Sequence, residues 1–310
     1  MTSELEFIAA LRAIAVGPEA RGLEDDAALL DELVITHDMI AEGVHYLAHD
    51  PAASVAAKLV AVTLSDLAAK GATPVAVLMG YCLGDGNWDR AFLAGLGEAL
   101  ASYDCALIGG DTIALPGGAP RVLGLTAIGR AGVRVPSRSG GKAGDGLWLV
   151  GALGDSAAGL RQLLADPQAE GPLVEAYRRP RALIAEGRAL AAHASAMMDV
   201  SDGLLIDADR MARASGVAIE IDLAALPVSG AFGDTLGHGQ AARLFAATGG
   251  DDYALLAALP PGVEAVVTKS LPGGAHLVRI GSLVAGEGIS LHEAGQPVIL
   301  PEHLGHEHRH

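Results

Sequence analysis

Short apolar runs alternate with helical segments along most of this chain, and that alternation limits the possible folds more than any other feature. The predicted strands cover residues 33–36, 75–81, 106–108, 122–128, 147–150 and 196–198. Between them, residues 51–70 and 88–103 carry apolar side chains at helical spacing. Strands that alternate with helices favour an α/β or α+β fold.

One segment without periodicity divides the chain. Residues 134–145 are rich in Gly, Ser and Arg, which is typical of a boundary between domains. A length of 310 residues suits one large domain or two ordinary ones. We therefore predict an N-terminal domain at residues 1–137 and a C-terminal domain at residues 138–310.

Aspartates gather at the ends of predicted strands and inside one predicted helix. Asp38, Asp111 and Asp199 each follow an apolar run, whereas Asp66 lies within the helical segment, where Asp is a poor helix former. The full set is Asp25, Asp26, Asp38, Asp66, Asp111, Asp199 and Asp202. Any one of them could be an ordinary turn or cap residue. Together, clustered carboxylates repel one another and need a cation, and Mg²⁺ prefers hard oxygen ligands combined with substrate phosphates.

Glycines accompany several of these aspartates. The pair Gly109-Gly110 lets a ligand approach the backbone closely. The segments at residues 154–156 and 201–203 lie at predicted helix starts, where free N–H groups can bind phosphate oxygens. Ordinary capping of those N–H groups by Asp and Ser explains the same pattern, and the sequence leaves both readings open.

Charge and cysteine content exclude some classes of partner. The formal net charge is −16, from 37 acidic and 21 basic residues. Such a surface disfavours nucleic acid and anionic membrane, because both need positive charge. The two cysteines, Cys82 and Cys105, provide no disulfide framework, and Glu4 and Glu6 stand where a signal peptide would be positive. We expect a soluble, cytoplasmic protein without a membrane span.

Two familiar phosphate-binding motifs are absent, and one metal motif is misleading. Gly141-Lys142 is followed by Ala143 rather than Ser or Thr, and no strand leads into Gly-x-Gly-x-x-Gly, which disfavours P-loop and Rossmann enzymes. Residues 306–310 match His-Glu-x-x-His formally. Zinc peptidases carry this motif within a helix, whereas here it ends the given sequence, so adventitious metal binding by a His-rich tail is favoured.

At this point the motifs resemble the thiamine-monophosphate kinase family, of the aminoimidazole ribonucleotide synthetase-like superfamily. The resemblance runs from about Leu23 to Leu300. The segments that carry it are residues 25–28, 36–38, 42–46, 64–72, 108–112, 154–160, 199–204 and 249–253. No single segment is specific, but their number and order are.

The resemblance implies an enzyme, a phosphotransferase that moves the γ-phosphoryl of ATP directly, in line, to thiamine monophosphate and yields thiamine diphosphate and ADP. It implies Mg²⁺ ligands at Asp26, Asp38, Asp66, Asp111, Asp199 and Asp202, with help from Thr36 and His37. It implies ATP contacts at Tyr103, Gly110, Asp111, Arg130 and Ser201, with Asp111 and Arg130 as the catalytic pair. It implies acceptor contacts at His45 and Asp251, and His306 is the nearest candidate for a side chain that stacks on the substrate.

The resemblance also implies a fold: a two-domain aminoimidazole ribonucleotide synthetase-like architecture. The N-terminal domain would join that of a second subunit in a homodimeric sheet or barrel, and the C-terminal α/β domain would close over the nucleotide. Four departures from the family pattern are Glu24, His37, Asp251 and Ala254. If His37 contributes its backbone carbonyl, its change is harmless; if it contributes its side chain, one metal is in doubt.

Two other readings stay open. One is another ATP-dependent enzyme of the superfamily, although the first cysteine, Cys82, lies far from the N-terminus where selenophosphate synthetases carry a reactive one. The other is a catalytically weak nucleotide-binding regulatory protein, which the departures at Glu24 and His37 and the missing substrate-stacking aromatic would suit.

Overall fold

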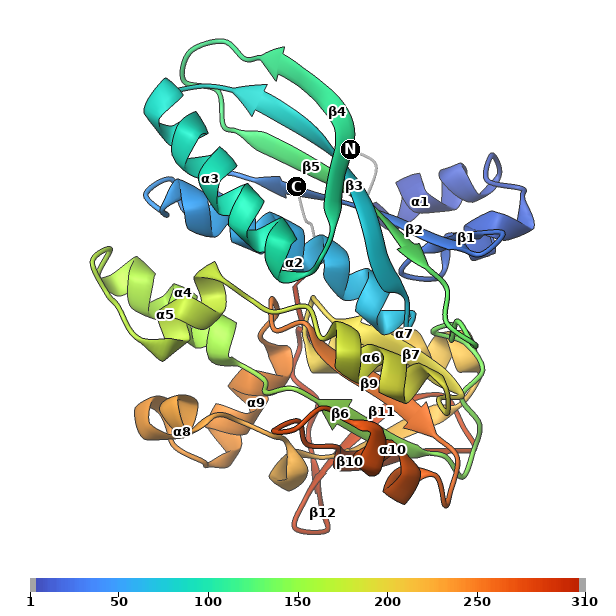
Figure 1. Ribbon diagram of the computed structural model, residues 1–310. Helices are drawn as coiled ribbons and strands as arrows, with labels where there is room; N and C mark the ends of the chain where they lie inside the picture. Colours follow the sequence, from blue (N-terminus) through green and yellow to red (C-terminus); the bar gives the residue numbers. More distant parts are fainter. Residues whose placement is uncertain (1–3, 307–310) are drawn as a thin grey trace.

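The computed structural model describes residues 4–306, which form two α/β halves stacked on one another (Figure 1). Residues 307–310 of the His-Glu-x-x-His match lie outside the described part. The N-terminal half consists of α1 (Glu4–Arg12), the 3-10 helix η1 (Pro18–Leu23), β1 (Ala28–Leu30), β2 (Leu33–Ala41), α2 (Ala52–Ala69), β3 (Thr73–Leu83), α3 (Gly86–Ser102), β4 (Ala106–Ala114) and β5 (Val122–Arg130). Its strands form one sheet in the order β1-β2-β5-β3-β4, in which only β3 and β4 are parallel.

One face of this sheet is packed and the other is open. Val77 and Leu125 alternate with outward residues and pack beneath α2 and α3 in a single apolar core. On the outer face, apolar side chains such as Met39 of β2 and Ile108 of β4 are more than half exposed. Every residue of β4 is exposed, so no element of the described chain covers this strand.

The C-terminal half carries a seven-stranded sheet in the order β12-β11-β8-β10-β6-β9-β7, whose only parallel pair is β8 with β11. The elements of this half are β6 (Gly146–Val150), α4 (Asp155–Ala165), α5 (Pro172–Arg178), α6 (Ile184–Ala191), β7 (Ala196–Val200), α7 (Leu204–Ser215), β8 (Ala218–Asp222), η2 (Leu223–Ala225), α8 (Gly230–Leu236), α9 (Gln240–Thr248), β9 (Ala254–Leu259), α10 (Glu264–Ser270), β10 (Val278–Val284), β11 (Gly288–Glu293) and β12 (Gln296–Val298).

Helix α2 lies between the two halves, as Figure 1 shows. It meets α6 so closely that a Cβ atom at Gly187 would lie 2.1 Å from the Ala68 carbonyl oxygen, which only glycine permits. By length and composition alone α2 could cross a membrane, but 83% of its 18 residues are buried inside the protein. It is a core helix that both halves share.

The predicted α/β class is confirmed, as is each predicted strand listed above. Within residues 4–306 the N-terminal sheet is open rather than closed into a barrel. A barrel would therefore require the N-terminal sheet of a second subunit.

Candidate active site

A cavity of about 420 Å³ opens between the two halves. The N-terminal sheet and α2 contribute one wall, and the ends of β7 and β9 with the start of α4 contribute the other. The predicted site residues that line it are Asp38, His45, Asp66, Asp199, Ser201, Asp202, Asp251 and His306. Residues from all parts of the chain thus converge at one place.

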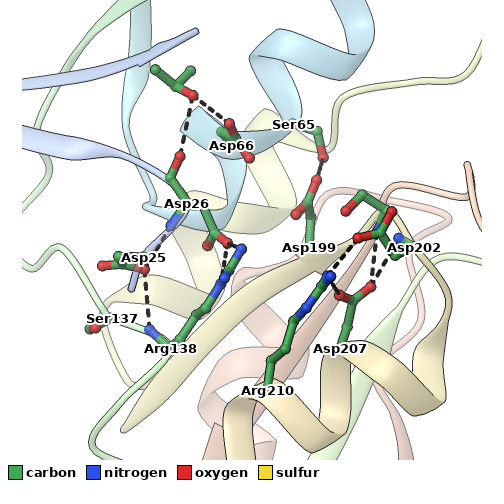
Figure 2. Close-up of polar contacts among 12 residues, drawn as sticks. Asp25, Asp26, Ser65, Asp66, Ser137, Arg138, Asp199, Asp202, Asp207 and Arg210 are labelled. Carbon is green, nitrogen blue, oxygen red and sulfur yellow. Dashed lines mark hydrogen bonds and ion pairs between the residues drawn. The ribbon is translucent and has the colours of Figure 1, made fainter. Parts of the chain in front are cut away.

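Three carboxylates meet beside this cavity. Asp26 precedes β1, Asp66 lies in the last turn of α2, and Asp199 lies in β7, yet their oxygens all fall within 4.8 Å of one another (Figure 2). Thr36 donates its hydroxyl to Asp66, and Ser65 donates to Asp199 at 2.6 Å. The position of Asp66 explains why an unfavourable residue stands in a buried helix: its side chain leaves the core for this cluster.

Burial and mutual repulsion change the pKa values of the cluster. Burial, followed by the charges of Asp38, Asp199 and Asp26, raises the pKa of Asp66 well above its usual value. Burial and the charge of Asp26 raise the pKa of Asp199 to about 8. The same two causes raise the pKa of Asp38 to about 6. Asp38, Asp66 and Asp199 therefore share a space in which burial and the neighbouring carboxylates resist their ionisation.

Asp26 is the exception, because basic side chains hold it. Burial would raise its pKa, but Lys70 at 2.6 Å and Arg138 at 2.6 Å outweigh burial and keep that pKa below its usual value. Lys70 also pairs with the neighbouring Asp25 at 2.5 Å. Arg138 comes from the segment between the domains, so this segment is tied to the cluster (Figure 2).

The arrangement fits a divalent cation. Three carboxylates converge here, and the pKa values of two of them, Asp66 and Asp199, are raised. The positive charge that the protein supplies is therefore insufficient at these two groups. Hard oxygen donors of this kind suit Mg²⁺. Asp26, Asp66 and Asp199 would hold such an ion, with Asp38 beside them.

We predict that Mg²⁺ stabilises the protein more at high pH than at low pH. Asp38 and Asp199 have higher pKa values folded than unfolded, so the folded state binds extra protons and stability falls as pH rises through about 6 and then about 8. A bound cation removes that penalty. Thermal unfolding in Mg²⁺ and in EDTA, at constant ionic strength, should show a Tm gain several degrees larger at about pH 8 than at about pH 5. Equal gains at both pH values would contradict this cation site.

The loop before α7 is held by a second acidic group. Asp207, which is fully buried, accepts hydrogen bonds from the backbone N–H groups of Ser201 and Asp202, both at 3.1 Å. Arg210 bridges Asp207 at 2.7 Å and Asp202 at 2.6 Å (Figure 2). At the start of α4, Asp252 accepts from the Gly154 N–H at 2.8 Å. These carboxylates hold the residues that lead into α4 and α7, but neither N-cap residue, Gly154 or Gly203, makes a side-chain cap hydrogen bond, so the structure does not decide between capping and phosphate binding at the two helix starts.

The other predicted residues do not line this cavity within residues 4–306. Asp111 lies on exposed β4, and Arg130 ends β5, where it pairs with Glu32 at 3.6 Å. The His37 imidazole bonds Thr126 at 2.8 Å on the open face of the sheet. Tyr103 follows α3 and accepts the Ala182 N–H at 2.9 Å. Gly110 lies on β4 beside Asp111. Their assigned roles stay predictions.

The three predicted acceptor residues do line the cavity. His45 accepts the Ala41 N–H at 3.1 Å through Nδ1, which fixes its ring in the turn after β2. His306 reaches the cavity because its N–H donates to the Asp202 carbonyl at 2.8 Å. Asp251 accepts from Ser156 at 2.8 Å and from the Tyr253 hydroxyl at 2.9 Å.

Sequence reasoning missed the basic residues of the site. Lys58 and Lys70 are among the largest fully buried side chains, and Lys58 lies in an otherwise apolar stretch of α2. A lone lysine in such a helix was the available signal, because a buried ammonium needs a partner. For Arg138 and Asp207 nothing in the local sequence indicated their role.

Comparison with known proteins agrees with this architecture. The chain matches the family models for AIR synthase related protein, N-terminal domain, at residues 24–131 and C-terminal domain at residues 142–293. It is 38% identical to the thiamine-monophosphate kinase of Caulobacter vibrioides, covering 99% of this chain and 91% of that protein. It is 36% identical to that of Escherichia coli K12, covering 93% and 91%.

Solved structures give the same result. The structure described as AaThiL complexed with AMPPCP and TMP superposes with a TM-score of 0.84 at 28% identity, covering 98% of this chain and 97% of that one. The thiamine-monophosphate kinase of Stenotrophomonas maltophilia K279a superposes with a TM-score of 0.77 at 34% identity, covering 95% and 96%. Relatives this similar, over nearly the whole chain and both domains, show that the chain belongs to the thiamine-monophosphate kinase family.

Proposed function

We propose that this protein transfers the γ-phosphoryl group of ATP to thiamine monophosphate and forms thiamine diphosphate and ADP. The observation that carries the proposal is the convergence of Asp26, Asp66 and Asp199 beside a cavity between the domains, in a chain of this family. The relative complexed with AMPPCP and TMP supports an ATP-like donor and this acceptor.

The chemistry needs positioning more than acid–base catalysis. The acceptor is a phosphate oxygen that is already ionised near neutral pH, so no strong base must remove a proton. The difficulty is to bring two polyanions together, and fixed charges in a defined geometry achieve that. Mg²⁺, when bound, would neutralise the phosphates and orient them for in-line attack. The chain's own part is to hold the cation through its aspartates and to keep Ser201 and Asp202 in place through Asp207 and Arg210.

We also propose a homodimer that forms through the open face of the N-terminal sheet. The apolar side chains exposed there include Met39, Leu78, Ile108 and Ile113. Exposed β4 is an unpaired edge with apolar residues, which a second copy would cover.

The proposed dimer also concerns the role of Asp111. Asp38 of β2 pairs with Leu125, Leu125 with Met79, and Met79 with Gly110, the neighbour of Asp111 in β4. Asp38 and Asp111 therefore lie three strand spacings apart, about 14 Å. Two aspartates that far apart cannot share one ion. A role for Asp111 at the cation site therefore requires the partner's Asp111, brought to the site across the dimer.

We further propose a cytoplasmic location. Cys82 and Cys105 are both free and buried, which suits a reducing compartment.

A product assay tests the main proposal. The purified protein, with ATP, Mg²⁺ and thiamine monophosphate, should form thiamine diphosphate, and EDTA should abolish the reaction. Absence of product under every metal condition would refute kinase activity. ATP binding that persists without turnover would instead favour the regulatory reading.

A further inference from the structure

Lys58 is a buried cation that has no role in the phosphoryl transfer described above. It lies in the middle of α2, 2% exposed, among apolar neighbours. Removing an ammonium group from water costs several kcal/mol unless partners compensate for the lost hydration. Its contacts should therefore explain why the helix carries it.

The Lys58 ammonium group reaches from the N-terminal half to the C-terminal half. Its Nζ donates to the carbonyl oxygen of Tyr177 at 3.0 Å and forms an ion pair with Asp251. It also lies 3.9 Å from the centroid of the Tyr177 ring, a cation–π geometry. Both Tyr177 and Asp251 line the cavity, so Lys58 supports its wall from behind.

Asp251 is held from several directions. Beyond Lys58, its carboxylate accepts from Ser156 at 2.8 Å and from the Tyr253 hydroxyl at 2.9 Å. Its backbone has a φ of 71°, in the left-handed region that few residues other than glycine adopt, and its N–H donates to the Ser201 carbonyl at 2.7 Å. A conformation of this kind persists only where its surroundings enforce it, and such sites cluster around ligands.

We propose that Lys58 is a positioning residue for the acceptor: it fixes the Asp251 carboxylate at the cavity wall where the thiamine part of the substrate binds. The proposal rests on the function proposed above. Thiamine carries a permanently cationic thiazolium ring, which a fixed carboxylate suits, whereas the phosphate end suits the cation site. Through Lys58, the core helix of the N-terminal half acts on the Asp251 side of the cavity.

The test is Lys58→Met, which keeps the unbranched shape of the side chain, one atom shorter, and removes its charge. We expect KM for thiamine monophosphate to rise roughly 10- to 100-fold, as for the loss of a charged hydrogen bond, while KM for ATP changes less than about twofold. Binding of thiamine monophosphate alone, measured by calorimetry, should weaken by the same factor. The split between the two substrates separates positioning from a general loss of structure.

Arg178→Met is the matched control. Arg178 also joins the two halves through a buried carboxylate, Asp50, at 2.8 Å; Asp50 bonds the Tyr177 side chain, so this variant disturbs the docking contact beside Lys58 and leaves the partners of the Asp251 carboxylate in place. Its loss should lower Tm and leave both KM values unchanged. If Arg178→Met raised KM for thiamine monophosphate as Lys58→Met does, the effect would belong to domain docking, and the proposal would fail.

A double variant covers the case in which Lys58→Met does not fold because it leaves a buried carboxylate without its cation. Lys58→Met with Asp251→Asn removes both charges. Its KM for thiamine monophosphate should equal that of Asp251→Asn alone, since Lys58 acts through Asp251. Additive effects, or equal rises in both KM values, would overturn the proposal. A wild type that neither binds nor phosphorylates thiamine monophosphate would refute the proposed function as well, so the two failures are distinguishable.

Discussion

Asp66→Asn should reduce kcat roughly 10³-fold, because the cation would lose one of its central ligands and with it several kcal/mol of charge stabilisation. The same change should make the cation-free protein more stable at about pH 8, where the wild-type carboxylates repel one another most strongly. Asn keeps the shape of the side chain and can still accept the Thr36 hydroxyl. Steady-state turnover and thermal unfolding in EDTA measure the two effects.

The opposite signs of these effects make the prediction specific. A substitution that merely damages the fold lowers activity and stability together. Asp234→Asn, which removes an exposed carboxylate in α8, serves as control and should change neither. Near-normal turnover of Asp66→Asn would exclude Asp66 as a ligand, and a lower Tm in EDTA would contradict the repulsion that its raised pKa reports.

The second large effect concerns Asp111. Asp111→Asn alone should abolish activity and leave the fold intact, because Asp111 is exposed in the single chain. If Asp111 serves the partner's site, a heterodimer of Asp111→Asn with Asp66→Asn regains one complete site from two inactive parents. Purified through two different affinity tags, that heterodimer should show about half of the wild-type activity, since one of its two sites has both aspartates.

A heterodimer as inactive as its parents would place Asp111 and Asp66 in the same subunit's site, against the separation across the sheet. A protein that stays monomeric in solution would refute the dimer proposal directly. Near-normal turnover of Asp111→Asn would remove this residue from the cation site.

Much of the fold follows from local pattern. The strands at residues 122–128 and 196–198 were predictable because short apolar runs bounded by polar turns have few alternatives. The packing of α2 between the halves was not, because its apolar surface is nearly continuous and shows no preferred face. Its close approach to α6 depends on Gly187, whose role appears only when the neighbouring backbone is known.

The acidic half of the site was predictable, and the basic half was not. Clustered aspartates were predicted to share a cation, and the family resemblance implied that Asp26, Asp66 and Asp199 do so, although they come from the turn before β1, from α2 and from β7. Lys70 and Arg138 reach Asp26 from segments remote in sequence, and nothing local specifies those pairs. The position of Asp111 relative to the cation site was not predictable either, because in our proposal it depends on a second subunit.

The departures from the family pattern differ in how closely they approach the site. Glu24 is exposed and pairs only loosely with Arg12 at 3.5 Å, so it faces away from the cluster. Asp251 is the departure with consequences, because its shorter side chain is held by Lys58, Ser156 and Tyr253 at the cavity wall.

The central claim is phosphoryl transfer to thiamine monophosphate, and the fate of the γ-phosphoryl tests it most directly. Purified protein is supplied with Mg²⁺, thiamine monophosphate and ATP labelled at the γ-phosphate, and the products are separated. We predict that the label appears in thiamine diphosphate, with one molecule formed for each ADP. Label found only in inorganic phosphate, or left in ATP, would contradict the account.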